Sequence, residues 1–63
     1  MKITISNLYA SHTVETDMTK VEWQNNLKLI AAGNINFITV KDIRNGRLIT
    51  ICPSNCSVIE VEE

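Results

Sequence analysis

Hydrophobic and polar residues alternate in several short stretches of the chain, and this alternation predicts β-strands. The first stretch, residues 2–6, reads KITIS and places isoleucines between polar residues. Three later stretches, 35–43, 47–52 and 57–62, are also rich in β-branched residues and alternate over part of their length. A period of two puts successive side chains on opposite faces of a strand. The pattern therefore predicts four strands in these ranges.

The segment that follows the first predicted strand gives a weaker signal. Residues 11–18 are polar and rich in threonine, so a loop and a weak edge strand around Thr13–Thr16 both remain open. The apolar positions also change from odd to even numbers before this segment. A bulge or turn near Ser6-Asn7 would account for that change.

The chain after Thr19 carries the signals of a helix. Thr19 and Glu22 have the spacing of a capping box, in which each side chain accepts a hydrogen bond from the other residue's backbone N–H. Gly33 is placed to end the helix in a left-handed conformation. Apolar residues recur with the helical period and predict one buried stripe. The stripe comprises Trp23, Leu27 and Ile30, and Met18 before the cap is expected to pack on Trp23.

Together the predicted elements follow the order β-α-β-β-β. Asn45-Gly46 is a strong signal for a tight type I′ hairpin, because both residues tolerate positive φ. The turn residues Pro53–Asn55 separate the last two strands. We therefore expect a single domain, residues 1–63, of the α+β class. One helix would pack on a small, mostly antiparallel sheet whose last three strands form a C-terminal meander.

A two-residue Asn45-Gly46 loop also predicts which side chains share a face of the hairpin. It would pair Arg44 with Arg47 and, further along, Val40 with Ile51. Both faces then carry apolar side chains, although one helix can cover only one face. We expect the helix to cover the face with Ile38, Val40, Ile49 and Ile51. The opposite face, with Ile35, Phe37, Ile43 and Leu48, needs another cover.

Two covers for this opposite face remain open. In the first, the N-terminal strand and the segment 8–18 fold over it. In the second, a second protomer or another protein covers it, because large exposed apolar patches mark interaction sites. The chain has only 63 residues and therefore little polypeptide to spare. The contact residues in the second case would be Ile35, Phe37, Ile43 and Leu48, with Arg44 and Arg47 at the rim.

Composition narrows the classes of protein further. Hydrophobic residues make up 44% of the chain and the net charge is −1, which is typical of a folding chain. A domain of this size buries only about 60% of its unfolded surface, so small folds often add disulfides, a metal or self-association. The chain has no long apolar run and no signal-peptide pattern near its N-terminus. We expect no membrane association and a cytoplasmic location.

The two cysteines, Cys52 and Cys56, lie in the sequence C-P-S-N-C. This spacing is one residue longer than the C-x-x-C redox motif. The only histidine, His12, leaves a zinc site within one chain short of four ligands. We interpret both cysteines as reduced, partly buried thiols, and a cysteine-dependent metal or redox protein is the third hypothesis. Self-association becomes the favoured compensation for the small core.

No group of residues predicts catalysis. His12 has a serine and two carboxylates nearby in the sequence, but a catalytic triad needs a pocket and an oxyanion hole that a domain this small rarely builds. The chain also has no glycine-rich phosphate loop. The glutamates near the C-terminus are interpreted as a solvated strand face that discourages edge pairing. We expect neither an enzyme nor a cofactor. The acidic residues concerned are Glu60, Glu62 and Glu63.

Nucleic-acid binding is the alternative function. Arg44 and Arg47 flank the predicted hairpin tip, and Lys41 lies on the same β-ribbon. Basic β-ribbons can enter a groove or contact phosphates. Against this interpretation, the chain lacks the basic excess that phosphate binding generally requires.

The end of the chain resembles the C-terminal hairpin of small uncharacterised proteins from Gram-positive bacteria and their prophages. The resemblance lies in FITVKDIRNGRLITI followed by SVIEVEE, within residues 37–63. It implies a small bacterial or phage accessory protein and transfers no catalytic residues. Our first hypothesis is therefore a non-enzymatic protein-interaction module that self-associates and acts as an accessory or modulator of a larger bacterial or phage protein.

Overall fold

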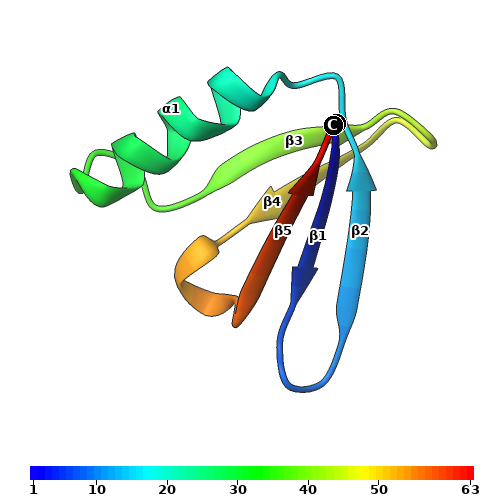
Figure 1. Ribbon diagram of the computed structural model, residues 1–63, viewed down its shortest axis with the longest axis horizontal. Coiled ribbons are helices and arrows are strands. Elements are labelled where there is room, and N and C mark those ends of the chain that lie inside the picture. The colour runs from blue at the N-terminus through cyan, green and yellow to red at the C-terminus, as the bar shows by residue number, and fades with distance from the viewer.

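The computed structural model describes residues 1–63 and contains five strands, one α-helix and one short 3₁₀ turn (Figure 1). The elements, in chain order, are β1 (Lys2–Ser6), β2 (Ser11–Glu15), α1 (Lys20–Ala31), β3 (Ile38–Asp42), β4 (Arg47–Ile51), η1 (Pro53–Asn55) and β5 (Val58–Glu62). The predicted α+β class is confirmed. The order β-α-β-β-β is also present, with β2 as an additional strand. β2 lies in the segment 11–18, for which the sequence allowed either a loop or an edge strand.

The strands form two antiparallel sheets, one of three strands in the order β2-β1-β5 and one of two strands, β3-β4. The predicted C-terminal meander is wrong, because β5 pairs with β1 and not with β4. The turn η1 leads the chain away from β4, and the N–H of Ser57 donates to the carbonyl of Ser6 at 2.9 Å. The alternating pattern of β5 predicts which side chains share a face, but it does not predict the neighbouring strand. β4 and β1 have similar alternating patterns, so β5 could pair with the edge of either one.

The hydrophobic core lies between the two sheets and against the helix. Ile3 and Val14 point into it from the three-stranded sheet, and Trp23 enters from α1. Ile38, Val40 and Ile51 contribute the facing side from the hairpin, as the sequence predicted. Both sheets and the helix therefore contribute to the core, which contains only six buried hydrophobic residues.

The ends of α1 have the predicted structure. The N–H of Glu22 donates to Oγ1 of Thr19 at 3.1 Å, and the N–H of Thr19 donates to Oε1 of Glu22 at 3.3 Å. Gly33 has a φ of 79° and follows the last turn. Its N–H donates to the carbonyl of Ile30. The predicted capping box and the left-handed glycine after the helix are confirmed. The helix α1 is neither long nor apolar enough to cross a membrane.

A tight loop joins β1 to β2, at the place where the change of alternation predicted a turn. Oδ1 of Asn7 accepts hydrogen bonds from the N–H groups of Tyr9 and Ala10, at 2.9 and 3.0 Å. This arrangement holds Leu8 and Tyr9 outward at the tip, where they are 88% and 93% exposed. Sequence alternation gave no sign that these two side chains would be so exposed.

Candidate interaction surface on the β3–β4 hairpin

The hairpin of β3 and β4 has a longer loop than the sequence predicted. Asp42 pairs with Arg47 and Val40 pairs with Ile49, so residues 43–46 form the loop. Of the residues at its tip, only Gly46 has a positive φ, at 74°, which excludes the predicted type I′ turn. The carbonyl of Asp42 instead accepts from the N–H of Gly46 at 2.7 Å. Each residue of β3 therefore pairs with a residue of β4 two positions earlier than predicted. A shift of two positions leaves every side chain on its predicted face of the hairpin.

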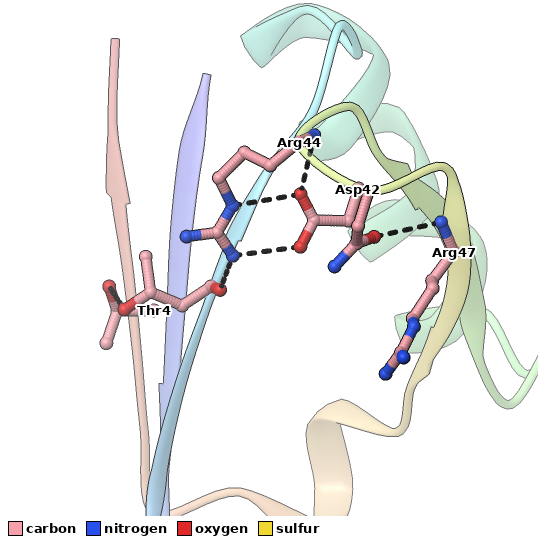
Figure 2. A network of polar contacts seen from close by, with 6 residues as sticks. Thr4, Asp42, Arg44 and Arg47 are labelled. Atoms are coloured by element: carbon pink, nitrogen blue, oxygen red, sulfur yellow. Dashed lines mark hydrogen bonds and ion pairs between the residues drawn. The ribbon is translucent and has the colours of Figure 1, made fainter.

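The Asp42 side chain explains the longer loop. Its carboxylate accepts from the backbone N–H of Arg44 at 3.1 Å, and from Nε and Nη2 of the same residue at 3.0 and 2.8 Å (Figure 2). Asp42 is only 1% exposed, so these charge-assisted bonds replace its lost hydration. The bond to the N–H of Arg44 forms a turn directly after Asp42, whereas the predicted two-residue loop would continue β3 as an extended strand through Arg44.

The contact between Asp42 and Arg44 shifts the pKa of both groups. The side-chain hydrogen bonds from Arg44 lower the pKa of Asp42 from 3.8 to about 2, even though burial acts in the opposite direction. The same hydrogen bonds raise the pKa of the Arg44 guanidinium. Both groups are therefore charged across the whole range of physiological pH.

The loop also attaches the hairpin to the edge of the three-stranded sheet. Nη2 of Arg44 donates to the carbonyl of Thr13 (Figure 2). The N–H of Ile43 donates to the carbonyl of Glu15 at 2.9 Å. Both acceptors belong to β2. Arg44, which the sequence predicted at the rim of an interface, thus binds residues of its own chain. The guanidinium of Arg47 has no ion-pair partner.

Of the residues that the sequence singled out as needing cover, Leu48 lies on the outer face of the hairpin, Ile43 lies in its loop, and Ile35 and Phe37 precede β3. Leu48 is 72% exposed, and Phe37 and Ile43 are each 54% exposed. Ile35 is half-buried. The N-terminal strands leave this face open because their own apolar residues pack against the inner face.

The exposed apolar residues are separated by polar ones along the two strands. Oγ1 of Thr39 lies 3.5 Å from Oγ1 of Thr50, in the middle of the face. Lys41 lies opposite Leu48 across the ladder. The only carboxylate on the hairpin strands, that of Asp42, is buried on the other face. The outer face therefore combines apolar and neutral polar groups with a positive charge.

Cys52 and Cys56 lie at the end of the hairpin, on either side of η1. Both are free thiols and partly buried. The thiol of Cys56 donates to the carbonyl of Cys52 at 3.5 Å, within the weak hydrogen bonds that sulfur makes. Three or more metal-ligating side chains do not gather anywhere in the molecule, and the surface has no pocket.

Comparison of the chain with protein-family models, with curated proteins and with solved structures finds no match. Its function is therefore inferred from its own residues. The features available for that inference are the exposed apolar side chains of the hairpin, its free strand edge and the distribution of charge around both.

Proposed function

We propose that this protein is a small, non-enzymatic interaction module that self-associates through its β3–β4 hairpin. The observation that carries the proposal is the exposure of Leu48 in β4, with Phe37 and Ile43 exposed directly before and after β3. Isolated exposed apolar residues are ordinary on protein surfaces, whereas several in and around one small hairpin favour an interface.

The surface area of the single chain supports the same proposal. A monomer of 7.1 kDa is expected to expose about 4,100 Å². This chain exposes 4453 Å², and only six hydrophobic residues are buried in its core. A second copy would remove further apolar area from water, at roughly 25 cal/mol per Å². Self-association thus compensates for the small core without a disulfide or a metal.

Two further considerations define the proposed role. The resemblance of residues 37–63 to small Gram-positive and prophage proteins favours an accessory or modulator of a larger bacterial or phage protein. The free thiols of Cys52 and Cys56 suit the reducing cytoplasm. Nucleic-acid binding at the hairpin tip has less support, because Asp42 neutralises Arg44 and leaves only Lys41 and Arg47 available.

The test is the oligomeric state over a wide range of protein concentrations, measured by sedimentation equilibrium. We expect reversible dimers of the wild-type protein and a dissociation constant at least about tenfold higher for Leu48→Lys, because the apolar contact of Leu48 with the second copy would be lost. Leu8→Lys is the matched control, since Leu8 is even more exposed but lies on the β1–β2 loop. A wild-type protein that stays monomeric throughout, or equal effects of the two substitutions, would overturn the proposal.

A further inference from the structure

We infer that a second copy of the chain associates by strand addition, with β4 of each copy pairing antiparallel to β4 of the other. The two hairpins would then form one continuous sheet. This inference rests on the proposed self-association and specifies its geometry. It follows from comparing the strand edges that the two sheets present, because each unpaired edge is a template for another strand.

The edge at β2 is closed by the hairpin loop. The carbonyls of Thr13 and Glu15 point away from β1, and both accept hydrogen bonds from the loop, one from Arg44 and one from Ile43. An added strand would have to replace these two bonds and separate the sheets. The Asp42–Arg44 pair thus blocks β2 as a site of strand addition.

The edge at β5 is protected by charge. Glu60 and Glu62 lie on this strand, and Glu63 follows it. In an antiparallel pair of β5 strands centred on Glu60, the two Glu60 carboxylates would lie directly opposite each other. Like charges in that position destabilise a ladder. Self-association at β5 is therefore disfavoured at neutral pH.

The two remaining edges belong to the hairpin. The free side of β3 meets β2 at its end, because the N–H of Ile43, directly after β3, donates to the carbonyl of Glu15. The helix α1, seen next to β3 in Figure 1, packs through Trp23 on the inner face of the hairpin. On the other side of the hairpin, β4 ends the sheet and has no further strand beyond it. β4 is thus the edge without a covering element or a barrier of like charge.

The sequence of β4 suits pairing with itself. It reads RLITI, which contains β-branched residues and no acidic side chain. A register centred on Ile49 places Leu48 opposite Thr50 of the partner subunit, and Arg47 opposite Ile51 of the partner subunit. No like charges meet in this register. The exposed side chain of Leu48 gains a neighbour on the outer face, as cross-strand pairs require.

A pair of matched variants separates strand addition from other modes of self-association. Thr39 and Thr50 face each other on the outer face, so Thr39→Lys and Thr50→Lys lose the same contact and add the same charge. Only Thr50 lies on the proposed pairing edge. We expect Thr50→Lys to weaken the dimer at least about tenfold and Thr39→Lys to weaken it less than about threefold. Circular dichroism will show whether both variants fold.

Hydrogen exchange of the wild-type protein provides a second test that needs no substitution. Alternate backbone amides of Arg47–Ile51 face the free edge, and we expect their exchange to slow as the protein concentration rises through the dissociation constant. If the wild-type protein is monomeric at every concentration, the proposed self-association fails and this inference fails with it. If the protein dimerises but the β4 amides keep their monomer exchange rates, or both lysine variants act equally, self-association stands and strand addition at β4 is wrong.

Discussion

Nη2 of Arg44 lies 2.8 Å from the carboxylate of Asp42 and also donates to the carbonyl of Thr13 on β2. One guanidinium therefore stabilises the loop of the hairpin and joins the two sheets. Asp42 is buried and Arg44 is half-exposed, so this pair differs from an ordinary surface salt bridge, which contributes little to stability. The pair determines the loop length, the position of the hairpin and the closure of the β2 edge.

Replacing Arg44 is expected to destabilise the protein far more than replacing Arg47. Arg44→Ala leaves the buried carboxylate of Asp42 without its charged donors and frees the carbonyl of Thr13. Arg47→Ala removes only an exposed guanidinium without an ion-pair partner. Thermal unfolding followed by circular dichroism should show a lower midpoint for Arg44→Ala and a nearly unchanged midpoint for Arg47→Ala. Equal midpoints for the two variants would contradict the structural role of Arg44.

The same pair predicts a loss of stability in acid. The pKa of Asp42 is about 2 in the folded protein, below its ordinary value of 3.8. A lowered pKa contributes stability that is complete above the ordinary value and is lost as the pH falls toward the folded value. We expect the free energy of unfolding to decline between pH 4 and pH 2. In urea titrations at each pH, Asp42→Asn should remove this part of the decline, and an unchanged pH profile in that variant would assign the decline to other carboxylates.

The capping box provides a prediction with a conservative control. Thr19→Ala removes the acceptor for the N–H of Glu22 and should lower the free energy of unfolding by about 1 kcal/mol. Thr19→Ser keeps the hydroxyl and should lie within a few tenths of a kcal/mol of the wild-type protein. Urea denaturation followed by the fluorescence of Trp23, which is buried in the core, measures both. A loss of equal size in the serine variant would mean that the threonine methyl group matters more than the cap.

The state of the cysteines can be measured directly. Cys52 and Cys56 are free thiols, so titration of the unfolded protein with a thiol reagent should give two thiols per chain. Because both residues are partly buried, the reaction of the native protein should be slower than that of the unfolded protein. A count below two would indicate a disulfide and would also argue against the cytoplasmic location proposed above.

Local features of this fold could be predicted from the sequence because each depends on few residues. Thr19 and Glu22, three positions apart, each accept a hydrogen bond from the other's backbone N–H, and no distant contact alters that arrangement. The faces of the hairpin were also predictable, because side-chain parity survives a shift of two positions. The core residues Ile38, Val40 and Ile51 follow from that parity.

Pairing and register required information that alternation does not contain. The loop of residues 43–46 depends on the buried Asp42 carboxylate and on Arg44, which binds that carboxylate and also the carbonyl of Thr13 on β2. The pairing of β5 with β1 could not be predicted either, because β1 and β4 have edges with a similar alternation of apolar and polar residues. The outer face of the hairpin was predicted as apolar, but its exposure depends on where Ile3 and Val14 pack, which no local rule determines.

Gly46 allows the backbone strain in the hairpin loop to be measured. Its φ of 74° lies in the left-handed region, and a Cβ at this position would meet no atom within 4 Å. Gly46→Ala should therefore cost only the backbone strain, roughly 1–2 kcal/mol. Gly33 has a φ of 79° and equally open space, so Gly33→Ala in the helix stop should cost a similar amount in urea unfolding. A much larger loss at Gly46 alone would mean that the added methyl group meets other residues, because strain by itself acts equally at the two positions.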